Sequence, residues 1–195
     1  MLIATWSLGR VRPMCRDGRP VHVEAATGDA RELATADELR ALLVAHGLAG
    51  LRWTNEVIIR RGTIPHSHPT LTLNTASTGD VLLSSYIHEQ LHWWLDANPG
   101  TDHAIAATGR LWATVPSTAD GGARDEYSTR LHLVLCHLER RALTEVVGAD
   151  RADSVVEQQI ARGIYPWIRH VILQCDAQLE EITEASGLWP PQKLR

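Results

Sequence analysis

The chain has 195 residues, of which 44% are hydrophobic and 22% are charged. This balance is typical of a globular protein and excludes an intrinsically disordered chain. The formal net charge of −4 gives no electrostatic reason to expect nucleic acid or an anionic membrane as a partner. No apolar stretch approaches the ~18 residues that a membrane-spanning helix needs.

The N-terminal sequence and the cysteines indicate the cellular compartment that is expected for the protein. The first twenty residues lack a charged region followed by a sustained apolar stretch, so no signal peptide is expected. Cys15, Cys136 and Cys175 are odd in number and widely spaced, which favours a reducing compartment over a disulfide framework. These features predict a cytoplasmic protein. The length suits a single domain over residues 1–195.

The first elements are expected to be strands and one helix. Residues 2–6 and 21–24 are short strand candidates separated by Arg, Gly and Pro. Thr35 is followed three residues later by Glu38, which is the capping-box pattern of a helix N-terminus. The sequence therefore predicts a helix that begins after Thr35 and ends at Gly47.

Two further strands complete the strand-rich part, residues 1–76. Residues 56–61 are β-branched in their middle, and residues 70–75 alternate polar and apolar side chains. The intervening residues 62–69 contain a glycine and two prolines, which favour a loop. His66 and His68 in this segment are expected to belong to the loop rather than to a second metal-binding pair.

The remaining part, residues 77–195, is expected to be helical. The predicted helices span residues 80–96, 101–114 and 125–147, and one or two more lie between residues 150 and 186, with breaks near Gly163 and Pro166. We therefore expect an α+β protein in which a small N-terminal β-sheet precedes a mainly helical bundle.

One predicted helix carries a motif with metal-binding chemistry. His88, Glu89 and His92 form the pattern H-E-x-x-H. Two histidines at i and i+4 lie one helical turn apart on the same face, so both imidazoles can meet one metal ion. Glu89 lies beside them, where its carboxylate can act as a general base without ligating the metal.

The surroundings of the motif favour this interpretation over a chance match. Apolar residues lie on several sides of the helix, namely Val81, Leu82, Ile87, Leu91, Trp94 and Leu95. The helix is therefore expected to be buried on more than one side. Histidines and a glutamate on a buried helix are costly without partners, because desolvation penalises unpaired polar groups.

The motif, on a helix that follows a short sheet and precedes further helices, resembles the zincin class of zinc metallopeptidases. The resemblance covers roughly residues 56 to 140. It implies that His88 and His92 bind zinc, that Glu89 is the general base, and that a third ligand lies farther along the chain. It also implies that residues 71–75 form a sheet edge with which an extended peptide substrate pairs.

The predicted helix over residues 125–147 offers candidates for the third ligand. Ser128, His132, Cys136 and Glu139 fall along one stripe of this helix, among apolar residues. His132 and Glu139 are two turns apart, about 10.5 Å along the axis, so one ion is not expected to bind both. We favour His132 as the ligand. Glu139 is the alternative third ligand or a partner that orients a ligating histidine, and a third ligand other than these two residues stays open.

Three neighbouring side chains are given other roles. Cys136 is expected to be a small core residue rather than a ligand. His137 points away from His132 on the helical wheel and is left out of the site. Tyr86 and Tyr127 are both conceivable as oxyanion-stabilising groups, and the sequence does not distinguish between them.

The predicted function is that of a zinc-dependent hydrolase, and we expect a peptidase that acts on a peptide or protein substrate. One Zn²⁺ per chain is expected, although imidazole ligands also suit other divalent transition metals. Two alternatives stay open. One is a non-catalytic metal-binding domain with a structural or partner-binding role, closed by a fourth protein ligand such as Cys136. The other is a fortuitous motif in a helical protein without a metal.

Overall fold

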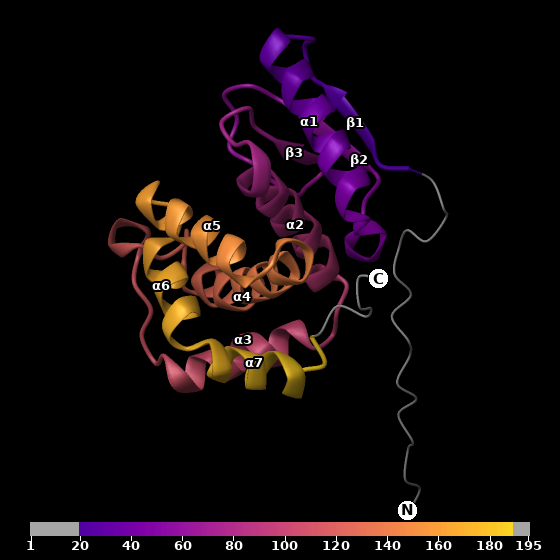
Figure 1. Ribbon diagram of the computed structural model, residues 1–195. Coiled ribbons are helices and arrows are strands. Elements are labelled where there is room, and N and C mark those ends of the chain that lie inside the picture. The colour runs from indigo at the N-terminus through magenta and orange to yellow at the C-terminus, as the bar shows by residue number, and fades with distance from the viewer. Residues whose placement is uncertain (1–19, 189–195) are drawn as a thin grey trace, which may run out of the picture.

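The computed structural model describes residues 20–188, which form three short strands and seven α-helices (Figure 1). The strands β1 (His22–Ala25), β2 (Glu56–Ile59) and β3 (Leu71–Leu73) form one parallel sheet in the order β1-β2-β3. The α+β class is therefore confirmed. The strand candidate at residues 2–6 and Cys15 lie outside the described residues.

The helix α1 (Ala30–His46) connects β1 to β2 and packs against both strands (Figure 1). Its C-terminus agrees with the prediction, because Gly47 adopts the left-handed conformation that ends a helix, with φ of 61°. The predicted N-terminus is wrong. The helix begins five residues before Thr35, and Asp29 is its N-cap, accepting a hydrogen bond from the Arg31 N–H.

The motif helix α2 (Gly79–Asp96) follows the sheet and packs against β3 and α1. Its N-cap residue Thr78 makes no side-chain capping bond. Glu38 performs this role from α1, because its Oε1 atom accepts a hydrogen bond of 2.6 Å from the Gly79 N–H. The carboxylate that suggested a capping box for α1 thus stabilises the N-terminus of α2.

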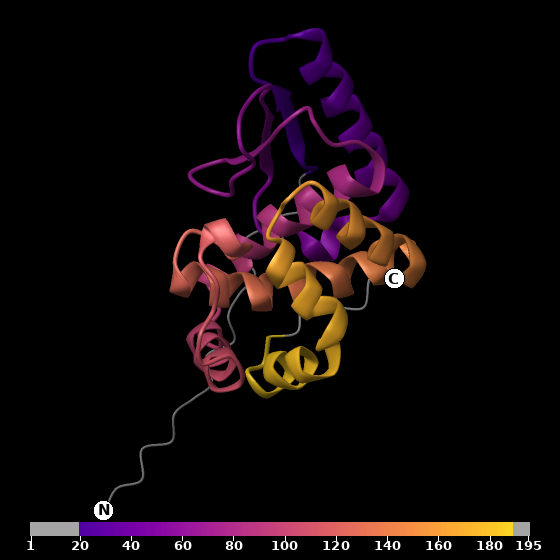
Figure 2. The same ribbon diagram turned by 90° about the vertical axis from the view of Figure 1, so that its left-hand side faces the viewer.

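The other helices surround α4 (Glu126–Val147), which begins after its N-cap Asp125 and ends before Gly148, as predicted. The helix α3 (Thr101–Leu111) is three residues shorter than predicted. Three helices follow α4 instead of one or two: α5 (Ala149–Ala161), α6 (Pro166–Gln174) and α7 (Asp176–Ala185). α3 and α7 lie beside each other at the end farthest from the sheet (Figure 2).

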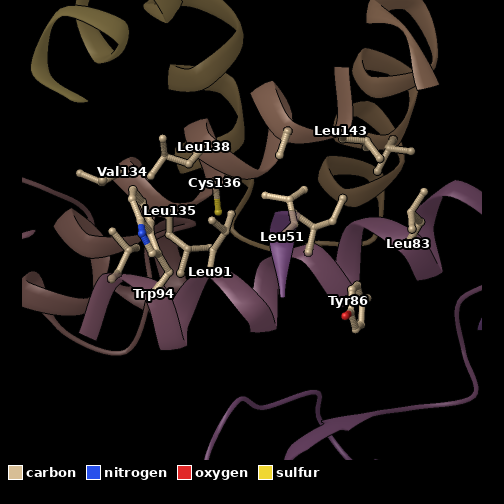
Figure 3. Packing of buried hydrophobic residues seen from close by; sticks show 14 of the residues in the cluster. Leu51, Leu83, Tyr86, Leu91, Trp94, Val134, Leu135, Cys136, Leu138 and Leu143 are labelled. Carbon is tan, nitrogen blue, oxygen red and sulfur yellow. The ribbon is translucent and has the colours of Figure 1, made fainter. Parts of the chain in front are cut away.

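Part of the hydrophobic core lies between α2 and α4, which pack against each other (Figure 3). Leu91 and Trp94 of α2 lie on the side of α4 that carries Leu135 and Cys136, and all four side chains are almost fully buried. This interface fixes the relative position of the two helices that carry the candidate site residues. Among the described residues, no helix is long and apolar enough to cross a membrane.

The contact between Glu38 and α2 can be tested by mutation. Glu38→Ala should lower the free energy of unfolding by about 1 kcal/mol, because it removes the hydrogen-bond acceptor and the negative charge at the helix N-terminus. Glu38→Gln should lose less, since an amide oxygen can still accept the bond. Denaturant unfolding measures both, with the exposed Glu145→Ala as control. Equal stability of Glu38→Ala and the control would contradict this role.

Candidate metal centre

The candidate site begins on α2, whose helical spacing brings His88 and His92 onto one face. Their ring centroids are 5.1 Å apart in an edge-to-face arrangement. His88 and Glu89 are both buried in the interior of the protein. His92 is half-buried. The motif therefore lies on a buried helix, as its apolar surroundings predicted.

α4 brings a third histidine to this pair. The ring of His132 lies 5.6 Å from that of His88 and 5.4 Å from that of His92. One ring nitrogen atom from each residue lies within 4.8 Å of the other two, which is compatible with ligation of a single ion. The three residues that the sequence selected as metal ligands thus occupy one cluster.

Glu139 lies behind this cluster rather than in it. Nδ1 of His88 donates a hydrogen bond of 2.8 Å to Oε2 of Glu139. Nδ1 of His132 donates similarly to the backbone carbonyl of Ser128, at 2.7 Å. Since carboxylate and carbonyl oxygens only accept, the Nε2 atoms of both histidines carry the free lone pairs in the neutral rings. These bonds give His88 and His132 the tautomer that a metal ligand requires.

The cluster favours one positive charge among neutral rings. Burial, together with the nearby positive charge of His88, lowers the pKa of His92 to about 2 and the pKa of His132 to about 4. Burial also favours neutral His88, but hydrogen bonds to Cys136 and Glu139 raise the pKa of this ring to about 10. One cation is therefore favourable beside Glu139, and the other two rings keep their lone pairs available.

The two buried glutamates near the cluster have opposite environments. The carboxylate of Glu139 accepts hydrogen bonds from four side chains, those of His88, Ser84, Gln159 and Arg169. Its pKa is lowered despite its burial, mainly by the charge of Arg169 and the bond from His88. Glu89 makes no hydrogen bond or ion pair with any residue between positions 20 and 188, and burial raises its pKa. A buried carboxylate without a protein partner is a candidate catalytic base.

A second group of possible donors lies deeper, formed by His88, Cys136 and Glu139. The guanidinium of Arg169 already lies against Glu139, with Nη2 at 2.9 Å from Oε2. A second cation at this position would be repelled by that charge. Cys136 is fully buried in the core cluster, in the place expected of a small core residue.

A tyrosine from a third helix borders the cluster. Tyr165, the N-cap residue of α6, places its ring 4.5 Å from that of His132. Tyr86 is fully buried, with its hydroxyl accepting a bond from Gln90, and Tyr127 is exposed. Tyr165 was not expected near the site, in contrast to Tyr86 and Tyr127, since nothing in the sequence relates α6 to the motif.

The loop over residues 62–69 lies beside the outer edge of β3. The backbone of His66 forms two hydrogen bonds with the backbone of Thr72, of 3.0 and 2.8 Å. Trp93 of α2 donates to the Ser67 carbonyl, and the ring of His68 stacks on Trp93 with centroids 4.0 Å apart. β3 is the edge strand of the sheet, but this loop already occupies the backbone hydrogen-bonding groups of Thr72 at the outer edge of β3.

Comparisons with protein-family models, with curated proteins and with solved structures found no match. The functional interpretation therefore depends on the geometry and chemistry of the cluster.

His137, which the sequence analysis left out of the site, lies on another face of α4. It is fully buried, with Nδ1 3.2 Å from Oδ1 of Asp176 on α7. Burial lowers the pKa of His137 to about 4, although Asp176 opposes the shift. Arg141 and Arg140 reinforce it.

The low pKa of His137 predicts a loss of stability in acid. Between pH about 6.5 and about 4, the unfolded chain binds a proton at this position that the folded chain does not, so stability falls as the pH falls. One such proton corresponds to roughly 1.4 kcal/mol per pH unit. Urea unfolding of metal-free protein at pH about 7 and about 5 should show a smaller loss for His137→Gln than for the parent. Identical losses would exclude His137 as a source of this dependence.

Proposed function

We propose that this chain is a zinc-dependent hydrolase of the zincin type that acts as a peptidase. The observation that carries the proposal is the convergence of His88, His92 and His132 beside Glu89, a buried carboxylate that has no partner among the described residues. A general base next to a three-imidazole cluster is the arrangement that metal-assisted hydrolysis requires.

The donor set fits a zinc ion. Imidazole nitrogen is a preferred zinc ligand, and catalytic zinc sites use three protein ligands and keep one position open. Residues 20–188 bring no fourth histidine, cysteine or carboxylate donor into the group formed by His88, His92 and His132. This favours hydrolysis over the non-catalytic alternative, in which a fourth protein ligand would close the site. A bound zinc ion would supply a Lewis acid and lower the pKa of a coordinated water to about 7.

The chain's own residues divide the remaining tasks. Glu89, whose pKa is raised by burial, would accept a proton from water near neutral pH and return it to the leaving group. Glu139 would hold His88 in the tautomer that directs Nε2 toward the cluster. The carbonyl of Ser128 would do the same for His132.

The substrate would be a peptide or a protein segment with an amide bond. Because the backbone of His66 uses both hydrogen-bonding groups of Thr72, an extended peptide would not pair with β3 at that residue. It would instead meet the loop over residues 62–69, where Pro65 and Pro69 offer no N–H donor. Backbone pairing of the substrate is thus expected to be short at this edge.

The role of Glu89 is tested by Glu89→Gln in the zinc-loaded protein. Hydrolysis of a peptide found in a fluorogenic library with the parent should fall by about 10²–10⁴-fold, because the amide is not a base. Zinc content should equal that of the parent, since Glu89 is not a ligand. Elemental analysis and initial rates measure the two effects, with Glu145→Gln as control.

Either of two results would contradict the mechanism. Parental activity in Glu89→Gln would exclude this residue as the base. Loss of zinc together with activity would assign Glu89 to the metal site itself.

A further inference from the structure

Arg169 is a buried cation whose position the proposed mechanism does not explain. It lies on α6 and is 1% exposed. Burying an arginine is costly unless its charge and its N–H donors are satisfied. The partners that it has among the described residues therefore indicate what it does.

The hydrogen bonds of this side chain converge on one residue. Nη2 of Arg169 donates to both carboxylate oxygens of Glu139, at 2.9 Å to Oε2 and 3.3 Å to Oε1. Nε and Nη1 have no hydrogen-bond partner among the described residues. Through the hydrogen bonds of its side chain, Arg169 is thus connected to the buried network by Glu139.

Glu139 also accepts a hydrogen bond from a candidate metal ligand, His88. The same Oε2 atom that accepts from Arg169 also accepts from Nδ1 of His88, at 2.8 Å. Ser84 and Gln159 donate to Oε1, so the carboxylate is held from both oxygens. The orientation of the His88 ring is therefore coupled to the position of the guanidinium.

The first turn of α6 contacts a second candidate ligand as well. The backbone N–H of Arg169 donates a hydrogen bond of 2.9 Å to the backbone carbonyl of Tyr165, one turn earlier. Tyr165 has a φ of 49°, a left-handed conformation that is uncommon for a residue with a side chain, and its ring packs on His132. One helical turn thus supports His132 directly and His88 through Glu139.

We infer that Arg169 is a positioning residue for the metal centre, acting through Glu139 to hold His88 in the geometry that binds zinc. A buried ion pair contributes little net stability, and apolar replacements of such pairs are often neutral or stabilising. Orientation of the ligand accounts for this buried pair, in the way that outer partners orient metal-binding histidines. The inference rests on the metal centre of the proposed function and not on hydrolysis.

The test is a double-mutant cycle on zinc affinity. Full-length parent, Arg169→Met, Glu139→Gln and the double variant are titrated with zinc against a chromogenic chelator at one pH. Arg169→Met should weaken zinc binding by about 10–100-fold. In the Glu139→Gln background the same substitution should change the affinity by less than about twofold, because the residue through which it acts is already altered.

A matched control separates orientation from loss of a buried arginine. Arg130 of α4 is also buried and is paired with Glu126, and neither belongs to the cluster. Arg130→Met should leave zinc affinity unchanged. The spectrum of the cobalt-substituted protein should change in Arg169→Met and not in Arg130→Met, since it reports ligand geometry.

Arg169→Lys keeps the inference testable where Arg169→Met does not fold. Lysine retains the charge and loses the planar guanidinium, so zinc affinity should be intermediate between that of the parent and that of Glu139→Gln. Parental zinc affinity in the folded Arg169 variants, or an equal loss in both Glu139 backgrounds, would overturn the inference while leaving the proposed hydrolase intact. A parent that binds no zinc would overturn both.

Discussion

Three histidines and two glutamates lie together where α2 meets α4, and the rest of the structure depends on how they compensate one another. Four of these side chains are buried, and His92 is half-buried. Three imidazoles and two carboxylates would be strongly destabilising if each were left alone in a low-dielectric interior. The structure combines them so that Glu139 is paired, two rings are neutral and a single positive charge is favoured beside the carboxylate. A metal ion among His88, His92 and His132 would satisfy the same electrostatic requirement as a proton on His88, while using all three nitrogen lone pairs.

This constraint explains why the two glutamates differ. Glu139 is saturated by hydrogen bonds and the charge of Arg169, so it stays ionised and fixes geometry. Glu89 has no such partners among the described residues and keeps a raised pKa, which suits proton transfer. The supporting helices then follow: α1 stabilises the N-terminus of α2, and α6 holds the far side of the cluster. Rigid elements rather than loops carry the proposed ligands.

Much of the site was predictable because helical periodicity is local. The spacing of His88 and His92, and the stripe that includes His132, required only that both segments be helical. Helical periodicity could not decide the role of Glu139, because the pattern of one helix does not give its distance from another helix. Arg169 and Tyr165 were missed because they reach the cluster through tertiary packing of a third helix. Glu38 misled the prediction of the start of α1 for a related reason: the carboxylate that suggested a local cap stabilises another helix.

In the proposed metal centre, the three histidines bind one metal ion and leave a position open for water. X-ray absorption at the zinc edge of the zinc-loaded protein tests it most directly. We expect a coordination shell of nitrogen and oxygen at about 2.0–2.1 Å, with scattering from three imidazoles and no sulfur. A sulfur contribution at about 2.3 Å would place a cysteine such as Cys136, which is grouped with His88, in the shell and would indicate a closed structural site. That result, or fewer than three imidazoles, would contradict the account.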